Sequence, residues 1–412
     1  MAVKALAIFR SRRMVVLFAL GFASGLPLYL TGQTLQAWLS SAGVPLSEIA
    51  AMSSVGLAYT LKFAWAPLLD RFQLPLLGRR RGWVLAFMVA LIVAIGGMGL
   101  VDPVAQPVLL SFAAVVVAIL SASLDVVLDA YNTDLLAPEE RAAGVAAYVL
   151  GYRVAIVVTG TLALVMADLL PWSVVYATMA ALMTIGIVAT LVAEEPPPPA
   201  QPTASLADAI ARPIIELWRR LGPITLALVL AFTLIYKFGD YFAQSLLLAF
   251  LQRGPGFALT EIALINQTLG IAGIMLGGLA AGSLVARFGL PRMLVGFGLL
   301  QATTNLLYAL LAVTGKSFVV FGAAVLFDNL ANTMGTAAFV ALLMSVCTSA
   351  VSATQFALLT SLSSVGQRVF GPFASDVVAR LDWSGFFIVT SAMAIPGLVL
   401  AALVARRIGR LR

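Results

Sequence analysis

Long runs of apolar residues follow one another along almost the whole chain, separated by short polar segments. A helix of about 20 apolar residues crosses a hydrocarbon layer of ~30 Å, whereas the strands of a β-barrel would show alternating segments of about ten residues. The runs therefore predict an all-α polytopic membrane protein with twelve transmembrane helices, at approximately 14–40, 46–68, 83–101, 107–134, 143–168, 172–193, 222–251, 259–286, 292–313, 317–346, 350–379 and 384–405.

Basic residues between the runs indicate an orientation. Of the 25 Lys and Arg residues, 18 lie in loops on the side that holds both termini, three lie in loops on the other side, and four lie within the runs. Because cytoplasmic loops carry the excess of positive charge, this distribution predicts that both termini are in the cytoplasm.

Three short motifs recur at nearly the same distance in the two halves. GVPLSEIA at 43–50 recurs 213 residues later as GFALTEIA, LLDRF at 68–72 recurs 216 residues later as LVARF, and GYRV at 151–154 recurs 215 residues later as GQRV. Six helices repeated in the same orientation are typical of the major facilitator fold, whose binding site lies between the halves near the bilayer midplane. The sequence therefore predicts six-helix bundles at 1–193 and 222–412.

The segment 194–221 is predicted to join the bundles on the cytoplasmic side. It begins EEPPPP, and consecutive prolines cannot continue the preceding helix. Leu206, Ile210, Ile214 and Leu217 then recur at helical spacing, which predicts a helix that lies in the membrane interface. A flexible linker is the alternative interpretation.

Composition narrows the possible chemistry. The chain is 61% hydrophobic and 10% charged, whereas soluble domains have about 25% charged residues, so a soluble globular protein is excluded. It has no histidine and a single cysteine, Cys347, which exclude an internal disulfide and metal clusters of these residues, and leave proton chemistry to carboxylates. The net charge of +7 comes from loops rather than from one basic face, so no nucleic acid is expected as a partner.

The stretch SASLDVVLDAYNTD, at 121–134, holds the candidate proton carriers. Asp125 and Asp129 lie one helical turn apart on one face of the predicted helix 107–134. A charge near the bilayer centre costs about 2.5 to 3.5 kcal/mol, and two like charges at this spacing also repel. We interpret the pair as the site of proton coupling. A structural ion pair that holds two helices together is the alternative.

Several motifs also carry a family resemblance. From about Arg10 to Pro396 the chain resembles the AmpG-type muropeptide permeases, through GFASGLPLYLTGQTLQAW, KFAWAPLLDRF, GRRRGW, SASLDVVLDAYNTD, EERAAG, LGYR, YKFGDYFAQSL, FVALLM and SATQFALL. The resemblance implies uptake of N-acetylglucosaminyl anhydro-N-acetylmuramyl peptides across the bacterial inner membrane, driven by the proton gradient, for peptidoglycan recycling. In such bacteria these fragments also feed β-lactamase induction. Some members carry two further C-terminal helices beyond the position where this sequence stops.

Further charges within the predicted helices are interpreted as a network that faces the protein interior. We predict that Arg153 neutralises Asp125 or Asp129 in one transport state and releases it in the other, with a permanent structural clamp as the alternative. Lys237 and Asp240 lie three residues apart and can pair on one helix. The network comprises Lys62, Arg153, Lys237, Asp240, Asp328 and Arg368.

A sugar–peptide ligand needs hydrogen-bond partners and flat faces for its rings. Two stripes of polar and aromatic residues are expected to supply them, one on helix 14–40 and one, which includes Asp240, on helix 222–251. Bonds between helices are the alternative role of the amides, and Lys62, Lys237 and Arg368 are candidate partners for ligand carboxylates. The candidate substrate-binding residues are Tyr29, Gln33, Gln36, Tyr236, Gln244, Asn266, Gln267, Asn305 and Asn332.

A cytoplasmic gate is predicted where the loop LLDRFQLPLLGRRRGW meets the end of helix 107–134. Basic side chains there would hold helix ends together through carboxylates. A patch that binds lipid headgroups or a partner is the alternative. The gate residues are Asp70, Arg71, Arg79, Arg80, Arg81, Asp134 and Arg141.

The sequence thus predicts a monomeric transporter that needs no cofactor or metal, works with protons, membrane lipids and a small glycopeptide, and is not an enzyme. An enzyme acting on wall precursors would need a reactive constellation, which the absence of histidine and of a cysteine pair disfavours. A major facilitator for another solute, such as a drug exporter or a lipid flippase, remains the alternative.

Overall fold

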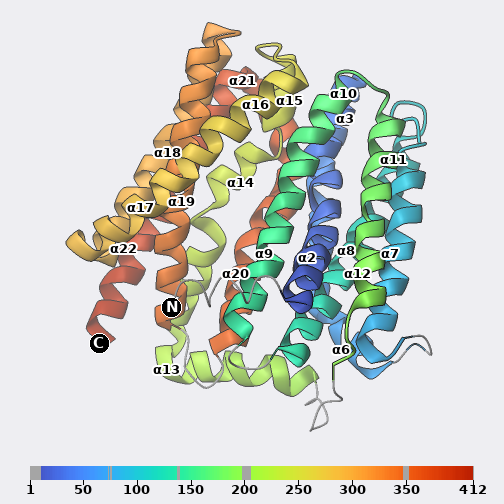
Figure 1. Cartoon of the computed structure of the whole chain (residues 1–412). Helices are drawn as coiled ribbons and strands as arrows, with labels where there is room; N and C mark the ends of the chain where they lie inside the picture. Colours follow the sequence, from blue (N-terminus) through green and yellow to red (C-terminus); the bar gives the residue numbers. More distant parts are fainter. Residues whose placement is uncertain are drawn as a thin grey trace. The chain divides into compact units, whose positions relative to one another are not determined.

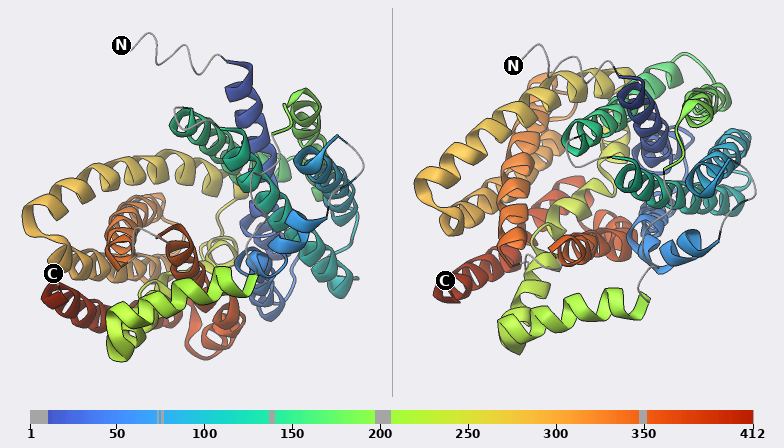
Figure 2. Two further views of the ribbon diagram at one scale, coloured as in Figure 1. Left: turned by 90° about the horizontal axis from the view of Figure 1, so that it is seen from below. Right: turned by 60° about the horizontal axis from the view of Figure 1, so that its bottom comes forward.

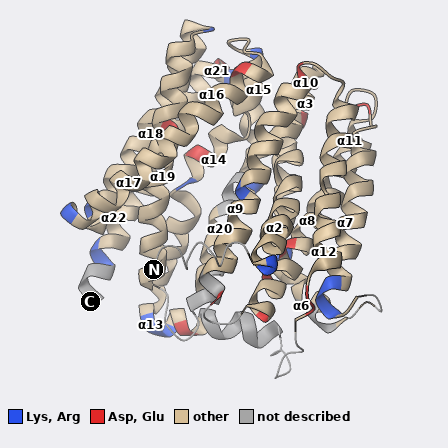
Figure 3. Cartoon of the chain, in the orientation of Figure 1, with Lys and Arg blue, Asp and Glu red and all other residues tan. Residues whose placement is uncertain are grey.

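The computed structural model describes residues 11–72, 74, 77–136, 140–196, 206–346 and 352–411. Every regular element in this part of the chain is helical, which confirms the predicted all-α class (Figure 1). Among the described residues, ten helical stretches are long and apolar enough to cross a membrane. Figure 3 shows why: the long helices are mostly uncharged, and Lys, Arg, Asp and Glu gather near helix ends with few in between.

The predicted helix 46–68 is not continuous. Its residues form five short helical pieces, of which η1 and η2 are 3-10 segments: α4 (Leu46–Ala51), η1 (Met52–Gly56), α5 (Leu57–Leu61), η2 (Lys62–Ala64) and α6 (Ala66–Arg71). One helical stretch, Leu358–Arg407, contains predicted helix 384–405 and most of predicted helix 350–379. The number of twelve membrane crossings therefore stays a prediction, as does the orientation.

The first compact unit comprises Met1–Val44 and Val55–Thr203. Within it α2 packs most extensively against α9, and the two lie side by side in Figure 1. Besides α5, η2 and α6, the unit contains α2 (Arg12–Leu30), α3 (Gln33–Ser41), α7 (Arg79–Met98), α8 (Pro107–Leu135), α9 (Arg141–Val157), the π-helical segment η3 (Val158–Leu162), α10 (Ala163–Ala167), α11 (Trp172–Leu182) and α12 (Thr184–Val192).

The second unit comprises Pro45–Ser54 and Ala204–Arg412. Its core includes Tyr236, whose ring stacks on Phe339 with centroids 5.8 Å apart. Besides α4, the unit contains α13 (Leu206–Ile235), α14 (Phe238–Gln244), α15 (Leu247–Arg253), α16 (Leu259–Ile265), the π-helical segment η4 (Asn266–Gly270), α17 (Ile271–Phe288), α18 (Leu290–Thr314), α19 (Phe318–Val346), α20 (Ser352–Phe370), the 3-10 segment η5 (Gly371–Phe373), α21 (Ala374–Ala392) and α22 (Ala394–Leu411).

The segment Pro45–Ser54 packs with the second unit although its sequence neighbours belong to the first. Its helix α4 contacts η5 and α21. Ser54 Oγ donates a hydrogen bond to the Arg368 carbonyl at 3.1 Å, and a Cβ at Gly371 would overlap Ser53 Oγ. The chain therefore crosses from one unit to the other twice before the predicted linker.

Helix α13 contains the predicted cytoplasmic helix. It bends at Gly222, where φ is 71°, so that the part before the bend runs at a steep angle to the part after it (Figure 2). Leu217 and Leu221 are buried in the unit's core, whereas Trp218 is 55% exposed. Residues 197–205 and the side chains of Leu206, Ile210 and Ile214 lie outside the described part, so the interfacial position stays a prediction.

Candidate functional site

Helix α8 carries Asp125 and Asp129 one turn apart, as the spacing predicts. Val127 and Leu128 between them are fully buried, so this part of the helix is packed into the first unit. Asp125 is partly buried, whereas the Asp129 side chain is 63% exposed. The two carboxylates therefore have different surroundings although they share one helix.

Close helix packing brings Ser24 to this site. A Cβ at Gly21 of α2 would overlap the carbonyl oxygen of Tyr148 on α9, and a Cβ at Gly151 of α9 would overlap the carbonyl oxygen of Phe18 on α2. Glycine is required at both positions because only a residue without a side chain allows two backbones to approach so closely. At this separation the hydroxyls of Ser24 and Tyr148 come within bonding distance of each other.

A chain of hydrogen bonds then runs from Tyr148 to Asp125. The Tyr148 hydroxyl donates to Ser24 Oγ at 3.0 Å, and Ser24 Oγ donates to Asp125 Oδ1 at 2.5 Å. Ser24 is 1% exposed and Tyr148 is 9% exposed. Burial makes such a donor valuable, because a carboxylate removed from water must be compensated by hydrogen bonds or by an opposite charge.

The opposite charge at this site comes from Lys62. Its Nζ lies 3.5 Å from Asp129 Oδ2, and its side chain is 33% exposed. Lys62 begins the 3-10 segment η2, and Trp65 after this segment donates from Nε1 to Ser123 Oγ on α8 at 3.0 Å. The indole therefore helps to hold the irregular segment, and with it the lysine, beside α8.

Arg153 does not take the predicted place of this cation. It is exposed on α9, and within the described residues it forms no ion pair with Asp125 or Asp129. The described structure therefore does not show the predicted state in which Arg153 neutralises Asp125 or Asp129. Lys62 is the cation beside Asp129.

Lys237 occupies a very different place in the second unit. The predicted helix 222–251 is interrupted at Tyr236 and Lys237, where α13 ends and α14 begins. Lys237 is 3% exposed, and its Nζ donates to Gln301 Oε1 at 2.8 Å and to Asn332 Oδ1 at 2.9 Å. No ion pair joins Lys237 and Asp240 in the described structure, although Lys237 directly precedes α14 and its carbonyl accepts a helical hydrogen bond from the Tyr241 amide at 3.0 Å.

Asp328, on α19, lies near Lys237. Thr304 Oγ1 donates to Asp328 Oδ1 at 3.2 Å, and Asp328 is 9% exposed. Asn305, next to Thr304, is 2% exposed, and its Nδ2 has no partner among the described residues. Asn305 therefore offers no surface to a ligand in this structure, and its Nδ2 forms no bond to another helix among the described residues.

The predicted stripe on helix 14–40 is broken in the structure. Helix α2 ends at Leu30 and α3 begins at Gln33, so Tyr29 and Gln33 lie on different helices. The break follows Pro27, whose carbonyl accepts from both the backbone amide and the hydroxyl of Thr31 at 3.1 Å. Gln33 is exposed, whereas Gln36 is 9% exposed.

The second predicted stripe is broken in the same way. Tyr236 is a core residue whose hydroxyl donates to the Leu294 carbonyl at 2.7 Å. Asp240 and Gln244 remain together on α14 and are partly exposed. The helix interruption at Lys237 separates them from Tyr236, so only the part of the stripe on α14 can face a ligand.

The remaining candidate amides lie on α19 and on an irregular segment. Asn332 is exposed, although its Oδ1 accepts bonds from Lys237 and Gln301. Asn266 is exposed and Gln267 is partly buried in the π-helical segment η4. Such π segments often occur at functional sites because they shift side chains out of the regular helical register.

Arg368, the remaining residue of the predicted charge network, is partly buried on α20.

The structure brings part of the predicted gate together. Asp134 Oδ2 accepts from Arg79 Nη2 at 2.7 Å and from Arg80 Nε at 2.9 Å. These pairs join the start of α7 to the end of α8. The side chains of Asp70, Arg71 and Arg141 lie outside the described part.

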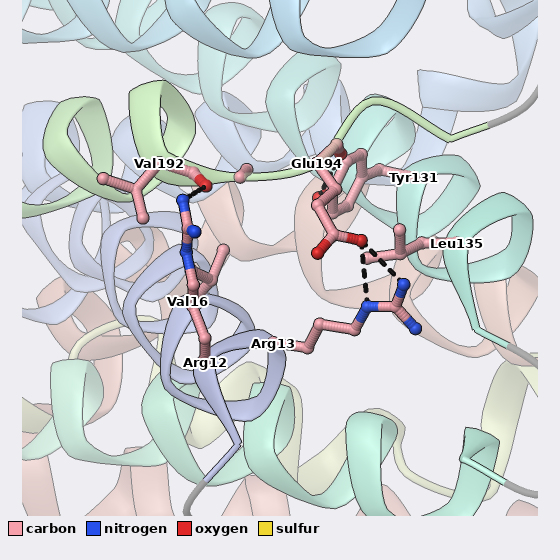
Figure 4. Close-up of a pocket in the computed structure, with 8 residues that line it drawn as sticks. Arg12, Arg13, Val16, Tyr131, Leu135, Val192 and Glu194 are labelled. Atoms are coloured by element: carbon pink, nitrogen blue, oxygen red, sulfur yellow. Dashed lines mark hydrogen bonds and ion pairs between the residues drawn. The ribbon is translucent and has the colours of Figure 1, made fainter.

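Two gate residues were missed by the sequence analysis. The Glu195 carboxylate accepts from the backbone amides of Arg80 at 2.8 Å and Arg81 at 3.1 Å, which are unpaired donors in the first turn of α7. Glu194 Oε2 lies 2.7 Å from Arg13 Nη2, and the Glu194 carbonyl accepts from the Tyr131 hydroxyl at 2.8 Å (Figure 4). Glu194 and Glu195 directly follow predicted helix 172–193, on the predicted cytoplasmic side that also holds the Arg residues. This position in the sequence could have identified them as gate residues.

The chain is similar to known transporters over almost its whole length. The family model of the Major Facilitator Superfamily matches residues 14–368. The sequence is 46% identical over 396 residues to the anhydromuropeptide permease of Escherichia coli K12, covering 96% of this chain and 80% of the permease. It is 28% identical to a putative AmpG transporter of Rickettsia felis, covering 95% and 96% of the two chains.

A solved structure supports the same fold. A bacterial homologue of the human lysosomal transporter Spinster, in an inward-facing and unoccupied conformation, matches with a TM-score of 0.73 and covers 97% of each chain. At 16% identity this likeness shows the fold alone.

Proposed function

This chain belongs to the Major Facilitator Superfamily and, within it, to the anhydromuropeptide permease family, and we propose that it imports anhydro-muropeptides together with protons. It is a multi-pass transporter of the bacterial inner membrane. The proposed substrate is N-acetylglucosaminyl anhydro-N-acetylmuramic acid, with or without its peptide, moved from periplasm to cytoplasm by alternating access.

The cluster of Lys62, Asp125 and Asp129 is the observation that carries the proposal. It places one ammonium and two carboxylates around α8, with a neutral hydroxyl donor on Asp125 and an exposed ion pair at Asp129. Intramembrane ionisable groups are costly and commonly mark ion pathways. An exposed pair can be opened and closed at a small energy cost, because exposed pairs contribute only about 0–1 kcal/mol.

Charge balance explains how such a cluster would couple the two solutes. A proton that binds Asp129 frees Lys62 from its ion pair and raises the net charge of Lys62, Asp125 and Asp129 from −1 to 0. A substrate carboxylate bound to Lys62 restores the original net charge. Proton and anionic substrate would therefore favour each other's binding, because a substrate carboxylate bound without the proton would add a third negative charge beside a single ammonium.

Exposure favours Lys62 over the other candidate partners of the ligand's carboxylates. The Lys62 side chain is 33% exposed and its only described carboxylate partner is at 3.5 Å. Lys237 is 3% exposed and its Nζ is already bonded to two amide oxygens. A ligand can therefore reach Lys62 without first dismantling a buried network.

Uptake into proteoliposomes tests this proposal. With the membrane potential clamped, labelled anhydro-muropeptide should accumulate when the outside is made acidic, by up to about ten-fold per pH unit for each coupled proton. Asp129→Asn should still exchange substrate across the membrane but should no longer concentrate it, because the residue can no longer bind a proton. Asp125→Asn should cause a smaller loss, since its amide oxygen can still accept from Ser24.

Asp102→Asn is the matched control. Asp102 lies between α7 and α8, where Oδ1 accepts from the amides of Val104 and Ala105, and an amide oxygen can do the same. Accumulation by Asp129→Asn at the wild-type level would reject the proton role. Absence of muropeptide uptake by the wild-type protein, with uptake or export of a drug or lipid instead, would favour a facilitator for another solute.

A further inference from the structure

An apolar groove of about 350 Å³ runs between α2 and α12 in the first unit. Val15, which is 59% exposed, and Val188, which is 61% exposed, stand at its edges. The groove is lined by Val15, Val16, Ala19, Thr184, Ile185, Val188, Ala189 and Val192. Its lining has a single hydroxyl and no charge, which suits a hydrocarbon chain.

One end of this groove carries a positive charge. Arg12 precedes Val15, Val16 and Ala19 by three, four and seven residues, so all four lie on one face of α2. Arg12 Nη2 donates to the Val192 carbonyl at 2.9 Å, which fixes the guanidinium at the end of α12 (Figure 4). Ala19 lies about 10 Å along the helix from Arg12 at 1.5 Å per residue.

The neighbouring arginine is already neutralised, whereas Arg12 is not. Arg13 binds Glu194 at 2.7 Å and Glu140 at 3.2 Å. Arg12 forms no ion pair within the described part of the chain, and its hydrogen bond to the Val192 carbonyl uses one of the five donors of a guanidinium. Arg12 lines a small pocket next to the groove, and Val16 and Val192 line both.

We propose that this groove holds one acyl chain of an anionic phospholipid, with the lipid phosphate bound to Arg12. A planar guanidinium binds phosphate oxygens in pairs, which gives the headgroup a fixed place. The lipid would join the first helix of the unit to its last, because α2 supplies the arginine and both helices supply the walls. A zwitterionic lipid would bind less well, since its ammonium offsets the phosphate charge and Glu194 is already occupied by Arg13.

Nanodiscs of defined composition test the site on the full chain. Native mass spectrometry of wild-type protein, taken from an equal mixture of phosphatidylglycerol and phosphatidylethanolamine, should show at least about five-fold preferential retention of the anionic lipid, a preference of about 1 kcal/mol. Arg12→Gln should remove the preference, and Arg12→Lys should keep part of it because the charge remains. Val188→Trp should reduce retention of both lipids by filling the groove.

Two substitutions elsewhere serve as controls. Val93→Trp places the same bulk at a 70% exposed position of α7, and Arg292→Gln removes an exposed arginine from α18. Both should retain lipid as the wild type does. Equal retention of the two lipids by wild type, unchanged preference in Arg12→Gln, or unchanged retention in a folded Val188→Trp variant would each overturn the proposal. Equal losses in Val93→Trp and Val188→Trp would also overturn it.

Discussion

The charged residues predicted to face the protein interior include one lysine and two aspartates from each unit, but the two sets are arranged differently. In the first unit, Lys62 and Asp129 form an ion pair at 3.5 Å with side chains that are 33% and 63% exposed. In the second unit, Lys237 is 3% exposed and bonds to neutral amide oxygens at 2.8 and 2.9 Å. The same residue types therefore form an open pair in one unit and an enclosed network in the other.

This difference indicates which set can exchange ions during transport. An exposed pair contributes little stability and can be replaced by a proton or a ligand at low cost. A buried lysine has lost its hydration, and removal of any compensating partner leaves a desolvated charge. We therefore assign transport to the Lys62 cluster and mainly a structural role to the Lys237 network.

The largest expected effect is on stability in the second unit. Lys237→Met should lower the free energy of unfolding by about 3–5 kcal/mol, because Asp328 then loses the nearby positive charge, and Gln301 and Asn332 lose their donor. Unfolding in a denaturing detergent titration measures this loss. Lys316→Met, at an ion pair with Glu261 whose lysine side chain is 40% exposed, should cost less than about 1 kcal/mol. Equal losses in the two variants would contradict the distinction.

Neutralising the acidic neighbours should recover part of that loss. When Asp240→Asn and Asp328→Asn are added to Lys237→Met, we expect at least about half of the lost stability to return, because no uncompensated charge remains buried. The same titration gives the comparison. A triple variant no more stable than Lys237→Met alone would show that the lysine acts through its amide bonds and not through charge.

A smaller effect is expected at the hydroxyl that serves Asp125. Ser24→Ala removes a hydrogen bond to a carboxylate, of a kind worth about 1.5–3 kcal/mol, and also removes the acceptor of Tyr148. We expect the gradient-driven uptake rate to fall by about ten-fold, as measured in proteoliposomes. Ser283→Ala is the control, since its exposed hydroxyl bonds to the Leu279 carbonyl of its own helix at 3.1 Å and to no carboxylate among the described residues. Wild-type uptake by Ser24→Ala would remove Ser24 from the coupling site.

The smallest effect on stability is expected at Lys62. Lys62→Met should change the free energy of unfolding by less than about 1 kcal/mol, because its ion pair is largely exposed. The same variant should nevertheless lose substrate accumulation, since no cation remains that could bind either Asp129 or the carboxylate of the ligand. A stability loss as large as that of Lys237→Met would mean that the two clusters do not differ as described.

The sequence predicted the features that depend on spacing within one helix. Asp125 and Asp129 share a face of α8 because 3.6 residues make one turn, and the apolar run around them required a long helix. The sequence also predicted that Asp134 would lie near Arg79 and Arg80, because the start of α7 and the end of α8 were expected on the same side of the membrane. The stripes on helices 14–40 and 222–251 assumed helices without interruption; the structure interrupts both, and their role in substrate binding stays a prediction.

What the sequence by itself determined is the class of the protein, its internal repeat and the position of its costly charges, because hydropathy and helical periodicity act locally along the chain. Tertiary structure alone decided that Lys62 pairs with Asp129, that Ser24 and Tyr148 serve Asp125, and that Lys237 is enclosed. These contacts depend on how closely helices approach, as at Gly21 and Gly151, and on where helices are interrupted. Neither is set by periodicity, since both depend on the packing of helices distant in sequence.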